Sequence, residues 1–151
     1  MEPSDPSSQE TSGNEHPLKV SCGIIVKNGK ILCAKRLSGS WDDLWEFPGG
    51  KVEKGESPSQ AVIRELYEEL NIHVEILLPM PTVLYRYPHL YLQLFPFICR
   101  ILENTPQITV HEEIRWLNPD ELQNLPWLAP NWAILSDLKK LLEDKPDLLN
   151  S

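Results

Sequence analysis

The sequence has few basic residues: 14 lysines and arginines stand against 22 aspartates and glutamates, which gives a formal net charge of −8. A surface with this balance repels polyanions on average, so the charge argues against stable binding to nucleic acid. A small phosphorylated ligand is still compatible with the acidity, because a bound divalent ion can turn a cluster of carboxylates into a cationic site. The charge therefore favours a small-molecule partner.

The chain also lacks a long apolar run and a basic segment followed by an apolar one near its start. No run approaches the ~18 apolar residues of a membrane span, and residues 1–16 do not have the pattern of a secretion signal. The cysteines are odd in number, lack metal-type pair spacing and lie in apolar segments: Cys22, Cys33 and Cys99. This usage is typical of buried reduced thiols. We therefore expect a cytoplasmic protein without a membrane anchor.

A length of 151 residues fits one domain with its own core. Residues 1–16 are rich in Ser, Pro and Glu and have no aliphatic residue after Met1, which predicts a disordered N-terminal tail. The folded domain is expected over 17–143, followed by an acidic C-terminal tail over 144–151 that frays. Whether the domain is a monomer or a homodimer is left open.

The apolar pattern predicts an alternation of strands and helices. Strands are expected over 18–27 and 30–36, joined as a hairpin by Asn28-Gly29, and over 72–78, 82–87, 90–101 and 114–117. Helices are expected over 58–70, 119–122 and 132–142. The order is β-rich, helix, β-rich, helix. It predicts an α+β domain with a mixed β-sheet sandwiched between helices.

The helix over 58–70 has clear start signals. Ser57 is a good N-cap, Pro58 occupies the first helical position, and Gln60 completes a capping box. An apolar stripe at helical spacing faces the core: Val62, Leu66 and Leu70. The opposite side carries Glu65, Glu68 and Glu69, whose like charges cost ~0.2–0.5 kcal/mol per neighbouring pair. By itself this face is either a solvated acidic surface or a functional cluster.

The residues before these glutamates favour function. From Gly50 the chain reads GKVEKGESPSQAVIRELYEELNI, which resembles the Nudix box, and the preceding WEFPG stretch over 45–49 extends the resemblance to MutT-type members. The matching places are Gly50, Glu56, Arg64, Glu65, Leu66, Glu68, Glu69 and Ile72. Asn71 stands where the family usually has glycine. Asparagine tolerates the left-handed conformation of a helix exit, so we expect no loss of chemistry there.

The resemblance implies the Nudix fold and a metal-dependent hydrolase. It assigns Mg²⁺, for which Mn²⁺ can substitute, to Glu65, Glu68 and Glu69 with the carbonyl of Gly49. Glu65 is also the candidate base, and Glu68 and Arg64 belong to the catalytic set. Phosphoanhydride hydrolysis needs charge neutralised on phosphate oxygens and a water activated, and carboxylate-held Mg²⁺ does both. Glu56 is expected to brace the box through an ion pair with Arg64, the alternative being two ordinary surface charges.

In this family a further acidic ligand normally precedes a strand tryptophan, here Trp116. Related sequences often read Glu-His where this one reads Val110-His111, with Glu112 next. Glu112 is either a replacement metal ligand or an exposed loop acid. His111 is expected to be a hydrogen-bonding loop residue, because Mg²⁺ prefers oxygen ligands.

Candidate substrate-binding residues follow from the same resemblance. Asn131 matches a base-reading asparagine, whose amide offers both donor and acceptor, or else it is a helix N-cap. Phe47 either packs on the base or belongs to the core. Lys35 or Arg36 matches a basic residue that contacts phosphate or base, with the register open by one position.

Three tyrosines, Tyr85, Tyr87 and Tyr91, are predicted to alternate on one strand face, either as a base-stacking wall or as ordinary β packing. The turn over 85–89 is shorter than the base-binding loop of MutT-type enzymes, which weakens the match to an enzyme that removes oxidised guanine nucleotides. The base therefore stays open.

The predicted function is Mg²⁺-dependent hydrolysis of a nucleoside or deoxynucleoside triphosphate to the monophosphate and pyrophosphate. The expected role is nucleotide-pool housekeeping, with a substrate such as 8-oxo-dGTP or a pyrimidine dNTP, modified or unmodified. Two alternatives are a Nudix hydrolase of dinucleoside polyphosphates or ADP-ribose, and a non-catalytic damaged-base recognition module like the one in MutY-type glycosylases. The intact Arg64-Glu65 and Glu68-Glu69 argue against the module.

Overall fold

The computed structural model describes residues 16–37 and 43–150, so the tail predicted over 1–16 lies outside the described residues except for His16. In chain order the elements are β1 Leu18–Lys27, β2 Lys30–Arg36, β3 Trp45–Glu46, β4 Gly49–Lys51, α1 Pro58–Leu70, β5 His73–Pro79, β6 Val83–Tyr87, β7 Leu90–Glu103, β8 His111–Leu117, the 3-10 helix η2 Pro119–Asn124, α2 Ala129–Asp144 and the 3-10 helix η3 Pro146–Asn150.

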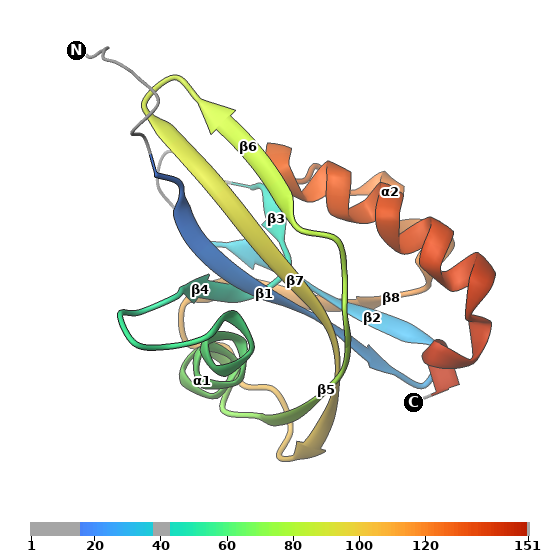
Figure 1. The fold of residues 1–151 in the computed structure, drawn as a ribbon. Helices are drawn as coiled ribbons and strands as arrows, with labels where there is room; N and C mark the ends of the chain where they lie inside the picture. Colours follow the sequence, from blue (N-terminus) through green and yellow to red (C-terminus); the bar gives the residue numbers. More distant parts are fainter. Residues whose placement is uncertain (1–15, 38–42, 151) are drawn as a thin grey trace.

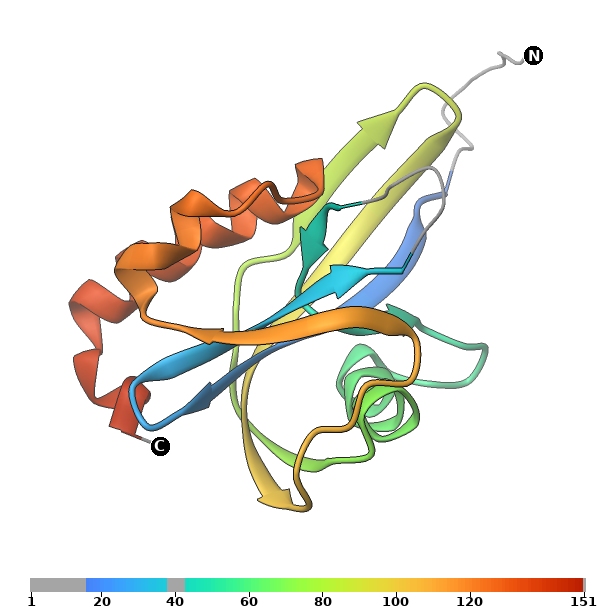
Figure 2. The same ribbon diagram turned by 180° about the vertical axis from the view of Figure 1, so that it is seen from behind.

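Strand β1 lies at the centre of the sheet. It runs parallel to β7 and antiparallel to β2 and β4. Strand β7 also pairs antiparallel with β5 and β6, and β2 pairs antiparallel with β3 and β8. Figures 1 and 2 show α1 and α2 on opposite sides of these strands. The predicted α+β fold with a mixed sheet between helices is confirmed.

The hairpin between β1 and β2 has the turn that its sequence demands. Lys27 pairs with Lys30 across a two-residue loop. Its two residues, Asn28 and Gly29, have φ values of 52° and 79°. A two-residue hairpin of this kind needs positive φ at both positions, which Asn-Gly adopts at little cost.

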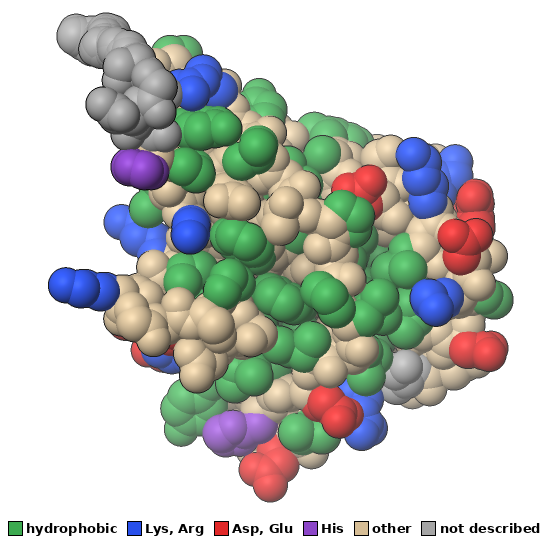
Figure 3. Space-filling view, viewed as in Figure 1, with side chains coloured by type: hydrophobic (Ala, Val, Ile, Leu, Met, Phe, Trp, Pro, Cys, Tyr) green, Lys and Arg blue, Asp and Glu red, His purple; other side chains and the backbone are tan. Residues whose placement is uncertain are grey.

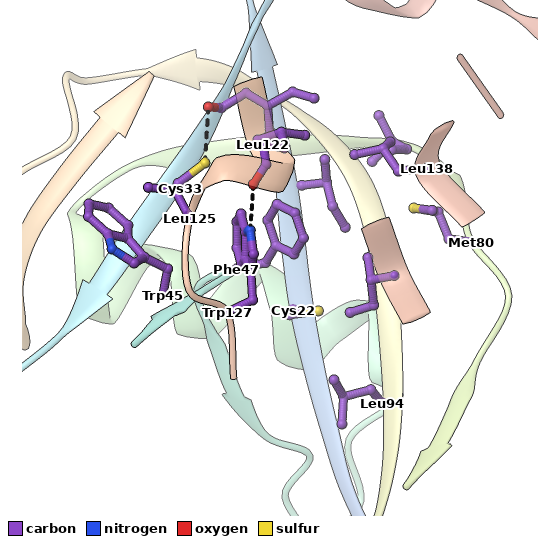
Figure 4. Close-up of a cluster of buried hydrophobic side chains, with 14 of the residues drawn as sticks. Cys22, Cys33, Trp45, Phe47, Met80, Leu94, Leu122, Leu125, Trp127 and Leu138 are labelled. Atoms are coloured by element: carbon purple, nitrogen blue, oxygen red, sulfur yellow. Dashed lines mark hydrogen bonds between the residues drawn. The ribbon is translucent and has the colours of Figure 1, made fainter. Parts of the chain in front are cut away.

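Successive side chains of the strands point to opposite faces of the sheet and pack into two separate cores. The core on the α1 side includes Ile25, Leu32, Val62, Leu66 and Leu70, and the core on the α2 side includes Ile24, Ile31, Trp127, Ile134 and Leu138. Figure 4 shows part of the second core, in which Trp127 donates a hydrogen bond from Nε1 to the Leu122 carbonyl at 2.7 Å. The three cysteines are buried free thiols, as predicted, and burial raises their pKa values.

Helix α1 begins and ends where the sequence predicts. The Ser57 hydroxyl accepts a hydrogen bond from the backbone of Gln60, and the Gln60 side chain accepts one from the backbone of Ser57. At the other end Asn71 adopts the left-handed conformation with φ 58° and donates its N–H to the Tyr67 carbonyl. Asparagine thus fills the position that is usually glycine in the Nudix box, and the exit of the helix is intact.

Several boundaries differ from the sequence-based expectation, and the largest differences are at α2, at β8 and in the C-terminal segment. Helix α2 begins at Ala129 rather than at 132, because Pro130 fits its first turn. Strand β8 begins at His111 rather than at 114. The segment expected to fray continues α2 to Asp144 and adds η3, where Leu149 packs against the α2-side core and accepts a hydrogen bond from Gly29 N at 2.9 Å.

The surface in Figure 3 carries apolar side chains across its middle and most of its charged side chains toward the periphery. None of the helices in the described part of the chain combines the length and the apolar character of a membrane span.

Candidate active site

Arg64 is the centre of an ion-pair network at the start of the acidic face of α1. Its Nε and Nη2 donate to the two carboxylate oxygens of Glu56 at 2.7 and 3.1 Å, and Nη2 also donates to the Lys51 carbonyl. Its Nη1 lies 3.0 Å from Glu65 and 3.1 Å from Glu68. The Glu56 contact raises the pKa of Arg64, and the Arg64 contact lowers the pKa of Glu56. The expected brace is therefore a bidentate pair rather than two unrelated surface charges.

Glu69 lies on the same side of α1 and points inward, where its carboxylate is in an unfavourable electrostatic environment. Its Oε1 is buried with no hydrogen-bond partner among the described residues. Burial first, and then the neighbouring charges of Glu46 and Glu65, raise the pKa of Glu69 to about 8, against a smaller lowering by the Gly49 backbone. A buried carboxylate surrounded by other carboxylates destabilises the fold unless something positive joins it.

Two glycines leave the space in which these carboxylates lie. A Cβ on Gly50 would meet the Glu65 carboxylate at 2.3–2.5 Å, and a Cβ on Gly49 would lie 1.9 Å from the Ser21 carbonyl. Contacts under 3.0 Å force a neighbour to move. Both glycines are thus required for close approach of the β4 backbone to α1 and β1 rather than for a positive φ.

The carboxylates have the chemistry of a site for a hard cation, although they are not gathered around one point. Across residues 16–37 and 43–150, no three His, Cys, Asp or Glu side chains form a metal-holding group. Glu65 and Glu68 turn toward Arg64, while Glu69 turns inward. The unpartnered Glu69 oxygen and the all-oxygen donor set fit Mg²⁺ or Mn²⁺ better than a softer metal.

A pocket of about 230 Å³ adjoins this face on the α2 side of the sheet. Its polar lining comes from Ser21, Arg36, Glu46, Tyr87 and Asn131 with the backbone of Gly49, and the remainder is mainly aliphatic. Gly49 also contacts Glu69 and lies in β4 beside the box. An apolar pocket with a few convergent polar groups is the usual form of a small-molecule site.

The structure separates the two candidate basic residues. Arg36 lines the pocket and donates from Nη1 to Glu46 Oε1 at 2.9 Å. Lys35 instead pairs with Asp43 at 3.2 Å, the contact that chiefly raises its pKa. A register shift between these two residues in the β2–β8 pairing breaks the strict alternation of side chains. Arg36 is therefore the one that can meet a ligand in the pocket.

Asn131 is not a helix N-cap, so that interpretation is wrong. Leu128 occupies the N-cap position of α2, and Asn131 is the third residue of the helix. Its buried side chain accepts a hydrogen bond at Oδ1 from Phe47 N at 3.2 Å and donates from Nδ2 to the Leu128 carbonyl at 3.4 Å. The acceptor of the amide is thus engaged by the protein, and the second Nδ2 hydrogen can serve a ligand.

The aromatic candidates divide between the core and the pocket. Phe47 is buried against Trp127, with ring centroids 4.7 Å apart, and also lines the pocket. Tyr91 pairs with Arg86 across β6 and β7 and shares its face, whereas Tyr85 and Tyr87 project to the other side. The prediction that the three tyrosines share a face is wrong, because Tyr91 lies opposite Arg86, whose side chain alternates with those of Tyr85 and Tyr87. Tyr87 lines the pocket, and the ring of Tyr85 packs edge-on against the ring of Tyr87.

Glu112 and His111, the candidates outside the box, have different surroundings in the structure. Glu112 is half exposed and lies 3.7 Å from Lys35 Nζ, and its role as a further metal ligand stays a prediction. His111 is a hydrogen-bonding residue as expected, but it is the buried first residue of β8 rather than a loop residue. Its Nε2 lies 2.8 Å from Glu46 Oε2.

Sequence reasoning missed Glu46. The residue joins Arg36, His111, the pocket and the electrostatic environment of Glu69. A signal was present, because Glu46 is the one charged residue between two aromatics that the strand pattern buries, Trp45 and Phe47. A charged side chain in such a buried stretch is stable only when it is paired with an opposite charge or hydrogen-bonded.

Comparisons with known proteins show similarity in sequence and in fold. A family model described as "NUDIX domain" matches residues 21–137. A protein of Escherichia coli K12 named "CTP pyrophosphohydrolase" is 38% identical over 118 residues, covering 75% of this chain and 84% of the relative. An "8-oxo-dGTP diphosphatase" of the same strain is 29% identical over 126 residues, covering 82% and 98%.

Among solved structures, the E. coli ORF135 protein matches with a TM-score of 0.79 and 29% identity, covering 91% of this chain and 99% of the other. A MutT NUDIX hydrolase from Burkholderia pseudomallei matches with a TM-score of 0.73 and 27% identity, covering 82% and 99%.

Proposed function

Because the chain belongs to the Nudix hydrolase family, we propose that it hydrolyses a nucleoside triphosphate to the nucleoside monophosphate and pyrophosphate with the help of a divalent metal ion. The observation that carries the proposal is the junction at Gly49, where a pocket suited to a nucleoside adjoins the carboxylates of α1. A nucleotide in this pocket would place its phosphates toward the acidic face.

The metal would be held by Glu65, Glu68 and Glu69 with the Gly49 carbonyl, and it would neutralise phosphate charge and acidify a water. Cation binding is favoured because it relieves the unpartnered oxygen of Glu69. Arg64 is fixed by Glu56 and by the Lys51 carbonyl. It in turn holds Glu65 and Glu68 on its own side of α1.

The chain's own residues would then share the work of positioning and proton transfer. Arg36 lines the pocket and would contact a phosphate or the nucleoside. Glu65 is the proposed base that takes a proton from the attacking water, because its carboxylate lies against Gly50 at the edge of the box loop. Arg64 orients Glu65 through a charge-assisted hydrogen bond of 3.0 Å.

The pocket also suggests which bases fit. Asn131 offers an N–H donor and Glu46 offers carboxylate acceptors. Cytosine presents a ring acceptor beside an exocyclic amino group, and guanine presents a carbonyl and an amino group. The proposed role is therefore nucleotide-pool housekeeping on a substrate such as 8-oxo-dGTP or a pyrimidine dNTP, modified or unmodified, which is consistent with the names of the relatives.

The test is a nucleotide panel with purified protein and Mg²⁺, scored for pyrophosphate and for the nucleotide product. Triphosphates should release pyrophosphate and a monophosphate, and chelation should stop the reaction. Glu69→Gln should remove most turnover, while Glu75→Gln, which breaks an exposed ion pair between Glu75 on β5 and Arg100 on β7, should leave it unchanged. Faster turnover of ADP-ribose or a dinucleoside polyphosphate would overturn the triphosphate assignment, and no turnover of any compound would favour a recognition module.

A further inference from the structure

His111 and Glu46 meet from distant parts of the chain. The imidazole Nε2 lies 2.8 Å from Glu46 Oε2, and the His111 side chain is 2% exposed. A carboxylate can only accept, so Nε2 carries the hydrogen and donates it whether the imidazole is neutral or charged. This contact is therefore a directed hydrogen bond from β8 to β3.

The other ring nitrogen of His111 makes the contact unusual. Nδ1 is buried and has no hydrogen-bond partner among the described residues. If His111 served only to stabilise the strand, an apolar residue in its place would give a more stable fold, because burying an unpaired polar atom is unfavourable. The single bond to Glu46 is what an imidazole adds at this position.

Glu46 is held from a second side by Arg36. Arg36 Nη1 donates to Oε1 at 2.9 Å, and Arg36 is the register partner of His111 between β2 and β8. The two anchors take one oxygen each, so the plane of the carboxylate is fixed. Glu46 is also the one carboxylate among the described residues that line the pocket. Each oxygen retains a further lone pair for a ligand.

We propose that His111 is a positioning residue that orients Glu46 to accept a hydrogen bond from an amino group of the base, and thereby sets a preference for amino-bearing bases. This inference rests on the proposed function, because it requires a nucleoside in the pocket. Without the Nε2 donor, Glu46 is held only by Arg36 and can rotate toward it. A variant without this donor should discriminate less between bases, whereas Glu65 and Glu68 on α1 should keep their contacts with Arg64.

The experiment compares two amides that differ in reach. In His111→Gln the side-chain nitrogen can occupy the place of Nε2, whereas in His111→Asn it reaches only the place of Nδ1. The readout is the ratio of kcat/KM for dGTP over dITP, whose bases differ only in one amino group. The asparagine variant should lose about tenfold in the ratio, the size of one hydrogen bond, and the glutamine variant should keep most of it.

Two controls separate positioning from stability. His73→Asn changes an exposed imidazole that stacks on Tyr67, and it should leave the ratio unchanged. Glu46→Gln should lower the ratio by itself, and adding His111→Asn to it should lower the ratio no further. Equal ratios in wild type and Glu46→Gln, or in both His111 variants and wild type, would overturn the proposal.

A measurement on the unaltered protein covers the case in which a variant does not fold. The ¹⁵N spectrum of the histidine side chains should show the proton of His111 on Nε2, and adding a monophosphate with an amino-bearing base should shift this signal more than its amino-free counterpart. A proton on Nδ1 alone would overturn the proposal. If the wild type hydrolyses no triphosphate, the proposed function fails, whereas hydrolysis without amino selectivity removes only the role of His111.

Discussion

Replacing Gly50 by alanine tests whether the position of Glu65 decides activity. The added Cβ would lie 2.3 Å from the Glu65 carboxyl carbon and 2.5 Å from each of its oxygens. Ordinary carbon contacts are about 3.5–4.0 Å, so the carboxylate has to retreat by roughly 1 Å. It is the far end of a flexible side chain, so the chain can fold around the change.

The expected magnitudes follow from this displacement. Overpacking of this kind costs about 1–3 kcal/mol of unfolding free energy, which lowers the melting temperature by about 2–4 °C per kcal/mol in a domain of this size. A misplacement of about 1 Å in a catalytic group can cost about 100-fold in rate. Activity should therefore fall far more than stability.

Gly55→Ala is the matched control. Gly55 has φ 83° and nothing within 4 Å of an added Cβ, so alanine there strains the backbone by about 1–2 kcal/mol without touching a carboxylate. Both variants are assayed for kcat/KM and for melting temperature with and without Mg²⁺. Gly55→Ala should melt lower but retain its activity and its stabilisation by Mg²⁺. Gly50→Ala with wild-type kcat/KM would refute the reasoning and remove Glu65 from the catalytic set.

Glu69→Gln should melt higher than wild type in the presence of chelator, because it removes a buried charge that lies beside other carboxylates, and it should gain less from Mg²⁺; a lower melting temperature with chelator would contradict this. Arg64→Lys should lower kcat by about 100-fold, because an ammonium cannot reproduce the bidentate contact with Glu56; steady-state kinetics with an undiminished kcat would rule it out. Stability should fall as pH drops through the lowered pKa of Glu56, since a depressed carboxyl pKa stabilises the fold only above that value; acid titrations of wild type and Glu56→Gln should differ in that range. Asn131→Asp keeps an acceptor for Phe47 N but loses the amide donor, so the ranking of bases should change, and an unchanged ranking would exclude a base contact.

The sequence by itself determined the features that depend on near neighbours. The caps and the apolar stripe of α1 define the helix from Pro58 to Leu70, and the 3.6-residue period alone places Glu65, Glu68 and Glu69 on its opposite side. Asn28-Gly29 likewise fixes a hairpin through the conformations of its own two residues. These signals are local, so no knowledge of the rest of the chain is needed to interpret them.

The tertiary structure decided everything that depends on a partner far along the chain. A register shift against β8 sends Arg36 rather than Lys35 into the pocket, and the backbone of Phe47, 84 positions away, takes the acceptor of Asn131. The meeting of Glu46 with His111 spans 65 positions. Which elements become neighbours is decided over the whole chain, whereas the apolar period of one strand or helix specifies only which of its own faces is buried. For that reason the acidic face could be identified from the sequence, whereas the role of Glu46 and the choice between Lys35 and Arg36 could not.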